Sequence, residues 1–548
     1  MWFKSVFLKS LRDYRVAILG WGIGMGLVIV SPMASVAELV KTPEARAALV
    51  SLAASFSWNA DAIKADTIGG YATFKIGIFI FLMVVWPILA GSRMLRGEED
   101  RASLDVLLSV PRSRVRVAVE KLAAMWTALL AMAVLIGILA YLGGLAFKAD
   151  FTLVDALLFG LNLALICAVF GAVALLVSQF THERGPAAGW TAGLLLVLIV
   201  VDMVHRVIPN TDWISCLSPI YYYNLSKPLI AGYGASAGAM LFLLALALIL
   251  SGAAIWLFAR RDIGDTVALP RILRLPPRPA APSALPVGDW SLRSGYARSL
   301  GVIAMPTLWW ALLVAGWAGW IVVVVKQIEA KLGTLYAGSP VLQDLLKNLS
   351  GGNSDFNASF LGAMFGILPI FLMAFAVTQV NRWASDESDG RLDLVLSAPR
   401  SRARVLLGRF AALSTAAAVI GLAALVATLV ASSVSGVSLN TANVVAATLG
   451  LIPMGLLVAA IGFLAAGWLR TAADTGLVSF LLAAWFFISF VGPELKLPEA
   501  TLRLSAFYYY GTPLLHGLQV VNMAVVVAVG AIALALGTLR FSRKDIAV

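Results

Sequence analysis

The stretch LDVLLSVPRSRVRV at residues 104–117 returns almost unchanged as LDLVLSAPRSRARV at residues 392–405. Shifting the chain by 288 positions places leucine, aspartate, serine, proline and arginine at the same places in both copies. The rest of the chain is mostly apolar, so the repeat marks two equivalent charged loops. Self-similarity over such a distance indicates that the chain contains two copies of one structural unit.

The composition identifies the environment of these loops. Of the 548 residues, 60% are hydrophobic and only 13% are charged, which is more apolar surface than a soluble core can hide. The apolar runs lack the alternating pattern of barrel strands, so we predict an all-α integral membrane protein with about 12 transmembrane helices. The predicted spans are approximately residues 16–34, 72–92, 118–145, 154–179, 186–207, 236–259, 303–325, 359–380, 406–432, 442–468, 474–492 and 518–540.

A proline-rich segment separates the two copies. The prolines of PRILRLPPRPAAPSALPVGDW (270–290) cannot continue a helix, and six predicted spans lie on either side. A second similarity, between LSPIYYYN (217–224) and LSAFYYYG (504–511), has a shift of 287. We therefore predict two parallel six-helix repeats, residues 1–265 and 298–548, joined by a cytoplasmic linker at 266–297.

The distribution of Lys and Arg predicts the orientation. Basic residues gather in the N-terminal segment, both repeated loops, the linker and the C-terminal tail, which the positive-inside rule places in the cytoplasm. The net charge of +12 thus follows membrane sidedness and argues against nucleic-acid binding. Residues 1–15 have one apolar and one basic helical face and are predicted to form a separate interfacial helix, with an uncleaved signal sequence as the alternative.

Each repeated loop has the pattern of a short amphipathic helix. Apolar residues at i, i+3 and i+4 form one stripe, a proline ends the helix, acidic residues precede it and arginines follow it. A basic loop of any sequence would satisfy the positive-inside rule. Two copies that match in leucine, aspartate, serine and proline therefore favour a docking element.

The acidic residues followed by LDxxLSxPRSR, between the second and third of six spans, resemble the permeases of ABC-2-type ATP-driven transporters. Two such halves in one chain are similar to bacterial exporters of polyketide antibiotics and other drugs. The resemblance implies that residues 98–114 and 386–402 couple to the ATPase, although the first copy has Arg101 and Ala102 where the second has Asp389 and Gly390. The implied coupling residues are Glu98, Glu99, Leu104, Asp105, Leu107, Leu108, Pro111, Arg112 and Arg114, with Asp386, Glu387, Leu392, Asp393, Val395, Leu396, Pro399, Arg400 and Arg402.

The energy source is expected on another chain. The sequence contains no GxxxxGK[ST] phosphate loop, and its two cysteines and three histidines are too scattered for a metal site. We expect no cofactor and no catalysis in this chain, with ATP and Mg bound by two copies of a partner P-loop subunit. Ion-coupled transport usually needs intramembrane carboxylates or histidines, which are scarce here, and a membrane-embedded enzyme would need a catalytic cluster.

Two external features complete the expectations. The tyrosines before each sixth span are external-gate candidates or members of an aromatic belt, namely Tyr221, Tyr222, Tyr223, Tyr508, Tyr509 and Tyr510. Asp202 and His205, near the external end of the fifth span, are candidate substrate contacts. We expect a bacterial cell membrane protein, in contact with lipid, that exports hydrophobic drug-like compounds, with lipid or lipid-linked polymer export as the nearest alternative.

Overall fold

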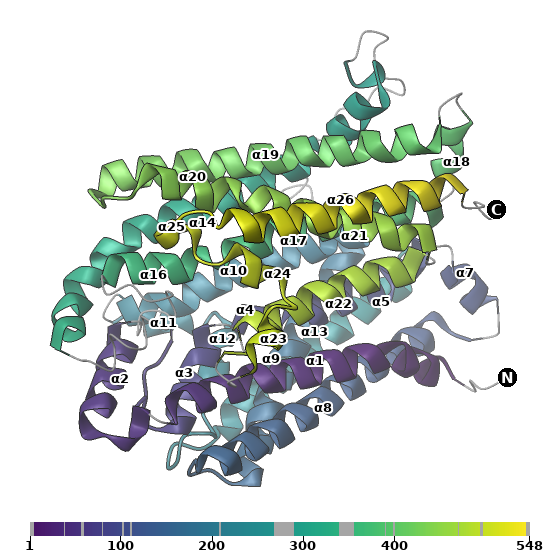
Figure 1. Ribbon diagram of the computed structural model, residues 1–548. Helices are drawn as coiled ribbons and strands as arrows, with labels where there is room; N and C mark the ends of the chain where they lie inside the picture. Colours follow the sequence, from purple (N-terminus) through teal and green to yellow (C-terminus); the bar gives the residue numbers. More distant parts are fainter. Residues whose placement is uncertain are drawn as a thin grey trace. The chain divides into compact units, whose positions relative to one another are not determined.

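The computed structural model describes residues 5–37, 39–55, 60–78, 80–100, 103–109, 112–207, 210–267, 290–338, 356–388, 391–397, 401–468, 471–490, 492–493 and 497–543. All regular structure in these ranges is helical, without a strand, which confirms the predicted all-α class (Figure 1). The chain divides into two compact units, Met1–Pro279 (unit 1) and Ala280–Val548 (unit 2). The division falls within residues 266–297, the predicted linker.

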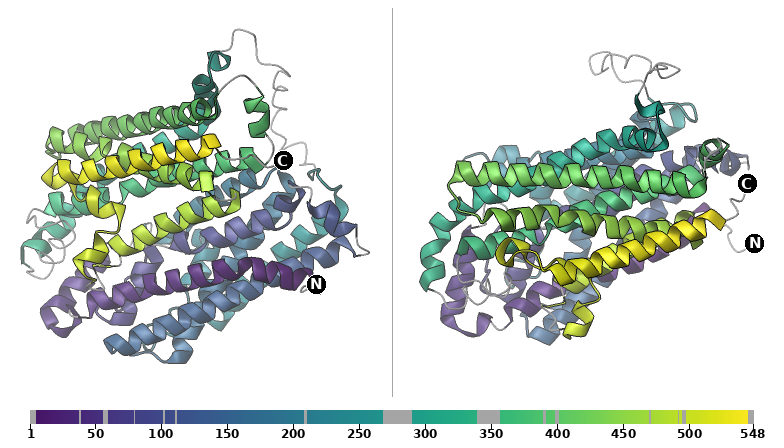
Figure 2. Two further views of the ribbon diagram at one scale, coloured as in Figure 1. Left: turned by 45° about the vertical axis from the view of Figure 1, so that its right-hand side comes forward. Right: turned by 45° about the horizontal axis from the view of Figure 1, so that its top comes forward.

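Unit 1 is a helical bundle built around α9. Helix α8 packs along α1, and α9 packs against α8, α13 and α5 (Figures 1 and 2). Its helices are α1 (Val6–Val36), α2 (Pro43–Ser55), α3 (Ile68–Ile78), α4 (Ile80–Met83), α5 (Val85–Met94), α6 (Arg96–Glu99), α7 (Ser103–Leu108), α8 (Arg114–Phe147), α9 (Leu153–Val177), α10 (Arg184–Val207), α11 (Asp212–Ser215), α12 (Pro219–Asn224) and α13 (Ala237–Arg260), with short 3-10 turns η1 (Leu39–Lys41) and η2 (Ser178–Phe180).

Unit 2 repeats this plan around α21. Helix α14 packs along α19, and α21 packs against α26 and α17. Its helices are α14 (Gly295–Gly338), α16 (Phe356–Phe365), α17 (Leu368–Ser388), α18 (Arg391–Leu396), α19 (Arg402–Ser435), α20 (Thr441–Leu449), α21 (Leu451–Trp468), α22 (Thr471–Phe490), α23 (Glu499–Leu502), α24 (Ala506–Tyr510), α25 (Pro513–His516) and α26 (Val520–Arg543), preceded by the 3-10 turn η4 (Trp290–Leu292).

Most of the long helices are suited to a membrane. Among the described residues, nine helices are long and apolar enough to cross it, and a bent pair, Ile68–Gly77 with Ile80–Met94, raises the number to ten. Helix α22 contains a shorter apolar stretch, Gly476–Phe490, and α17 also coincides with a predicted span. The multi-pass prediction is confirmed, and the count of twelve stays a prediction.

The second predicted span is broken in both units. In unit 1 the two helical segments meet at an angle of 71°. The second segment is interrupted again between α4 and α5, where the carbonyl of Met83 accepts hydrogen bonds from Trp21 Nε1 and Cys167 Sγ, each at 3.4 Å. In unit 2 the corresponding break lies at Gly366 and Ile367, between α16 and α17. In unit 1, side chains thus replace the backbone partner that a continuous helix would supply.

The N-terminal prediction of a separate interfacial helix is wrong. Helix α1 runs unbroken for 31 residues, with Ser5 as its N-cap. The Glu120 carboxylate of α8 accepts hydrogen bonds from the backbone N–H groups of Val6 and Phe7 at 2.9 and 3.2 Å, which fixes the helix start against α8. A helix of this length spans about 46 Å against roughly 30 Å of hydrocarbon. Its first turns therefore still extend beyond the apolar layer.

Candidate functional site

Each repeated loop contains the short helix that its sequence predicts. Helices α7 and α18 are six residues long and lie 288 positions apart. Leu104 and Leu392, their equivalent leucines, are fully buried. Asp105 of α7 is exposed, and Val395 of α18 is 41% exposed. Each helix therefore has one anchored side and one side open to a partner.

Not every predicted coupling residue can be placed. Leu107, Leu108 and Leu396 are partly buried and pack against the cores beside their loops. Pro111, Pro399 and Arg400 lie outside the described residues, as do the side chains of Glu387, Asp393 and His205.

Equivalent apolar clusters hold the two loops. The clusters join the loop, the end of the second span, the following helix, the fourth span and the end of the sixth span. The matched members are Leu95 and Trp383, Leu104 and Leu392, Ala118 and Leu406, Leu175 and Phe463, and Phe258 and Phe541. The first four pairs keep the 288-residue shift. Each loop is therefore anchored to the same elements of its own unit.

An ion pair is also repeated with the same shift. In unit 1 the ammonium of Lys121 on α8 pairs with the Glu98 carboxylate. In unit 2 Arg409 Nη2 on α19 lies 2.9 Å from Asp386 Oδ2. Both pairs tie the acidic residue before the short helix to the first turns of the helix that follows the loop. Glu98 and Asp386 therefore act within the chain to fix the loop.

The following helices begin in the same way. Ser113 and Ser401 cap α8 and α19, and their hydroxyl oxygens accept from the backbone N–H groups of Arg116 and Arg404 at 3.3 Å. Both helices run for 34 residues. The serine of PRSR is thus an N-cap, which explains its place directly after the proline and arginine.

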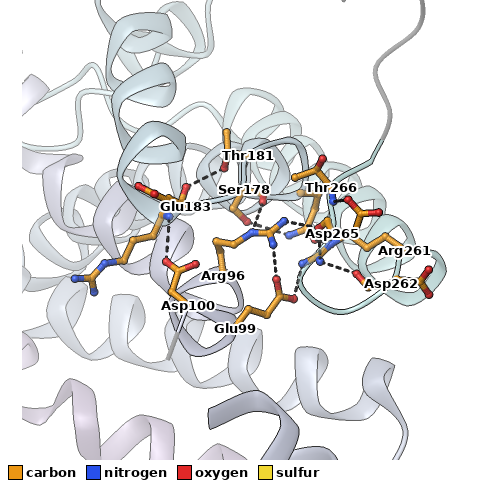
Figure 3. Close-up of polar contacts among 12 residues, drawn as sticks. Arg96, Glu99, Asp100, Ser178, Thr181, Glu183, Arg261, Asp262, Asp265 and Thr266 are labelled. Atoms are coloured by element: carbon orange, nitrogen blue, oxygen red, sulfur yellow. Dashed lines mark hydrogen bonds and ion pairs between the residues drawn. The ribbon is translucent and has the colours of Figure 1, made fainter. Parts of the chain in front are cut away.

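Unit 1 adds a buried charge network to its loop (Figure 3). The Glu99 carboxylate lies between two guanidinium groups, with Oε2 at 2.6 Å from Arg96 Nη1 and Oε1 at 2.5 Å from Arg261 Nη2. The three side chains are only 1–3% exposed. Burial and the positive charge of Arg261 lower the pKa of Arg96, and Glu99 opposes that shift. Glu99 thus neutralises the repulsion between the two arginines.

The remaining donors of this network reach backbone and amide acceptors. Arg96 Nε donates to the Ser178 carbonyl at 3.2 Å, and Arg96 Nη2 donates to the Asp265 carbonyl at 2.9 Å. Arg261 Nε donates to Gln179 Oε1 at 2.9 Å. The predicted coupling residue Arg114 joins the same region, because its Nη1 donates to the Arg261 carbonyl at 3.1 Å.

Glu99 is one of the implied coupling residues, and a residue that contacts a partner would have to face solvent, which Glu99 does not. The Glu99 side chain is 2% exposed because both of its oxygens bind arginines of the same unit. The acidic residues of this loop that are exposed are Asp100 and Asp105. Two features of the sequence carried a signal for the network, an arginine three residues before Glu99 and another directly after the sixth span.

The tyrosine segments are a second repeated element. Ser218 and Ser505 cap α12 and α24, and their hydroxyls donate to the carbonyls of Leu198 and Trp485 at 2.8 Å. Ser218 and Ser505 lie 287 positions apart in the sequence, and so do Leu198 and Trp485. Each short helix is thus attached to the preceding long helix of its own unit by the same hydrogen bond.

The triple tyrosines divide into exposed and buried members. Tyr223 and Tyr510 are buried, and burial raises the pKa of both phenols. The first two tyrosines of each segment are partly exposed and meet edge to face, with ring centroids 5.5 Å apart in both units. Only Tyr221, Tyr222, Tyr508 and Tyr509 therefore offer accessible ring surface in these two segments.

A buried charge cluster holds the tyrosine segment of unit 1. Asp61 accepts from Arg206 Nε and Lys227 Nζ, each at 2.7 Å. Asp202, the candidate substrate contact, lies 2.7 Å from Arg206 Nη1 and accepts from Asn224 Nδ2 at 3.1 Å. The Asp202 side chain is 4% exposed, so its contacts lie within this cluster. The i,i+4 spacing of Asp202 and Arg206 was the sequence signal for it.

The described parts of the chain include a hollow of about 380 Å³ beside the end of α13, lined by Trp256, Leu257, Arg260, Arg261, Asp262, Asp265, Thr266 and Val267. No group of three or more His, Cys, Asp or Glu residues in them could hold a metal ion. A smaller cavity in unit 1, beside Trp21, Met25 and Cys167, measures about 20 Å³, enough for about one water molecule. The repeated loops are therefore the strongest candidate site.

Comparison with known families accounts for almost the whole chain. Residues 5–263 match the family described as ABC-2 family transporter protein. Residues 293–542 match the family described as Multidrug efflux system permease Rv1217c, C-terminal domain. The comparison with curated proteins gives no match. The two matches cover the bundles of both units, and the chain belongs to the ABC-2-type permeases, the membrane subunits of ABC transporters.

Proposed function

We propose that this permease belongs to an ATP-driven exporter and that α7 and α18 each dock one of two P-loop ATP-binding subunits. The observation that supports this most strongly is the repetition of one device. Each unit carries a six-residue helix with one buried leucine, one ion pair to the next helix and one exposed side. A dimer of ATP-binding subunits offers two equivalent surfaces, and the chain offers two equivalent loops.

The packing of α7 against neighbouring helices would transmit a movement of the loop to the membrane-spanning helices. Leu104 lies in one cluster with Leu95 at the end of the second span, Val117 in α8 and Phe258 in α13. Movement of α7 therefore displaces the end of the second span together with α8 and α13, because a close-packed core transmits strain. ATP and Mg bind to the partner subunits, whose closure moves the loops, and hydrolysis resets them.

We propose a hydrophobic, drug-like cargo. The long helices present many exposed apolar side chains, and apolar surface accepts amphipathic molecules better than sugars or ions. The tyrosine segments lie at the opposite ends of the long helices from the loops, which suits the exposed rings for an external gate. Asp202 and His205 are kept as weaker candidates for substrate contact. Lipid or lipid-linked polymer is the alternative cargo, since the same surface would serve.

The docking proposal predicts a loss of transport when the exposed sides of α7 and α18 change. We expect Asp105→Arg and Val395→Arg each to lower ATP-dependent uptake of a hydrophobic antibiotic into inverted vesicles by about tenfold, because altering an interface contact commonly costs about 1–2 kcal/mol. The double variant should abolish uptake. Fluorescent phospholipid, measured in the same vesicles, tests the alternative cargo.

Asp150→Ala is the control, because Asp150 is exposed and lies between α8 and α9, at the other end of α8 from the loop. Copurification of an ATP-binding subunit with each variant separates lost docking from lost transport. If the double variant retains both the subunit and the uptake, the loops are not the docking elements.

We further propose that both loops and both termini are cytoplasmic. Cys216 is exposed and lies in the segment before α12, whereas Cys167 is buried. A membrane-impermeant thiol reagent should therefore label Cys216 in intact cells. In a Cys216→Ser background, Ser109→Cys and Ser397→Cys should react only in inverted vesicles. Labelling of either introduced cysteine from outside would reverse the orientation.

A further inference from the structure

We propose that the two docking loops are mechanically unequal, because Arg96 joins the loop of unit 1 to the end of α13 and the start of the linker. Arg96 is thus a positioning residue for coupling. The inference rests on the proposed docking function, but its structural premise concerns this chain alone.

Arg96 connects three separate parts of unit 1 (Figure 3). Its guanidinium pairs with Glu99 in α6, donates to Ser178 in η2 and donates to Asp265 after α13. Ser178 and Asp265 lie 82 and 169 positions from Arg96 in sequence. A planar guanidinium with all its nitrogens bound holds one geometry, so these three parts are held as one body.

The linker start is fixed by further bonds. Arg261 Nη1 donates to the carbonyls of Asp262 and Asp265 at 3.1 and 2.9 Å. The backbone N–H of Val267 donates to the Gln179 carbonyl at 3.0 Å. Residues 261–267 therefore follow the loop of unit 1 when it moves.

Unit 2 lacks the central residues of this arrangement. The position equivalent to Arg96 is Ala384, which is buried, and the position equivalent to Gln179 is Gly467. The stem of Arg540 fills the space beside Gly467, and its guanidinium lies 5.1 Å from the exposed ring of Trp468. Neither Ala384 nor Gly467 has a side chain that can make the equivalent hydrogen bonds.

The consequence is a difference in how the loops respond. Asp386 and Arg409 tie the loop of unit 2 to α19, as Glu98 and Lys121 tie the loop of unit 1 to α8. Unit 1 adds the polar link from its loop through Arg96 to the carbonyls of Ser178 and Asp265, for which Ala384 offers no side-chain donor in unit 2. A partner that pushes on both loops therefore moves the linker through unit 1.

Hydrogen exchange of the full chain in lipid nanodiscs, without any partner, tests the premise. Amides of residues 103–109 should exchange about tenfold or more slowly than those of 391–397, because charged hydrogen bonds oppose local opening. Arg96→Ala with Gln179→Gly places the residues of unit 2 into unit 1 and should remove the difference. Arg116→Ala, an exposed residue of α8, should leave it unchanged.

Arg96→Lys covers the case in which the double variant does not fold. It keeps the charge but loses the planar fork, so the exchange difference should shrink while the chain stays folded. Equal exchange of both loops in the unmutated chain, or an unchanged difference in Arg96→Lys, overturns the inference.

The effect of Arg96 on coupling is tested in vesicles that contain the chain with its copurified ATP-binding subunit. Arg96→Ala should lower the cargo moved per ATP hydrolysed several-fold while the KM for ATP stays unchanged, which a general loss of stability would not produce. An unchanged ratio also overturns the inference. If the unmutated chain retains no ATP-binding subunit, the proposed function fails, whereas the exchange difference between the loops remains measurable.

Discussion

Replacing Glu99 by alanine is expected to lower the free energy of unfolding by about 3–5 kcal/mol, the usual cost of removing one partner from a buried ion pair. The substitution leaves Arg96 and Arg261 side by side, with side chains 1% and 3% exposed and without the carboxylate between them. Thermal unfolding of the full chain in nanodiscs, followed by tryptophan fluorescence, measures the effect.

Asp105→Ala is the matched control, because Asp105 is an acidic residue of the same loop and faces solvent. Its unfolding midpoint should equal that of the unmutated chain. Equal midpoints for Glu99→Ala and Asp105→Ala would show that the network contributes nothing to stability.

The second large effect is expected at the other end of unit 1. Asp61→Ala removes the shared partner of Lys227 and Arg206, whose side chains are 4% and 5% exposed. Arg206 keeps Asp202, and Asp61 itself is 26% exposed. We therefore expect a smaller loss, of roughly 2–4 kcal/mol. The tyrosine segment should also become open to protease added outside intact cells.

Acid should reproduce this loss in the unmutated chain. Burial raises the pKa of Asp61, but Lys227 and Arg206 together lower it by more, so the pKa of Asp61 lies below its ordinary value. The carboxylate therefore stabilises the fold above about pH 4 and loses that contribution as the pH falls through the lowered pKa. Burial also lowers the pKa of Lys227 against the attraction of Asp61, but lysine titrates far above the acid range.

Two variants test the assignment of the acid response. Asp61→Asn should lose stability at neutral pH and show a weaker decline in acid. Glu499→Ala removes an exposed ion pair with Arg503 and should leave the unfolding midpoint unchanged. An acid response that persists fully in Asp61→Asn would assign it to another group.

The repeated loops could be predicted because their signals are local. The apolar stripe, the proline and the following serine lie within about fifteen residues, and the same pattern occurs a second time 288 residues later. Leu104 and Leu392 occupy the buried positions that this pattern assigns to them. The positions of the nine long apolar helices followed in the same way from local hydropathy.

The charge clusters could not be predicted because their members meet only through tertiary packing. Asp61 lies 145 positions from Arg206 and 166 from Lys227 in the sequence. The local pattern around Glu99 predicts a solvent-facing acidic segment, since acidic residues favour a helix N-terminus in water. An arginine from the end of the sixth span changes that environment, and no local pattern contains it.

Helices α8 and α19 are long, unbroken helices that begin directly after the repeated loops. A 34-residue helix is about 51 Å long, so tilting it by about 5° about its loop end shifts its far end by about 4 Å. The loop itself hardly moves in such a rotation, because the rotation axis lies at the loop end of the helix. If the ATP-binding subunits dock at these loops as proposed, this geometry favours a small rotation there over a long stroke as the source of a large displacement on the opposite face of the membrane.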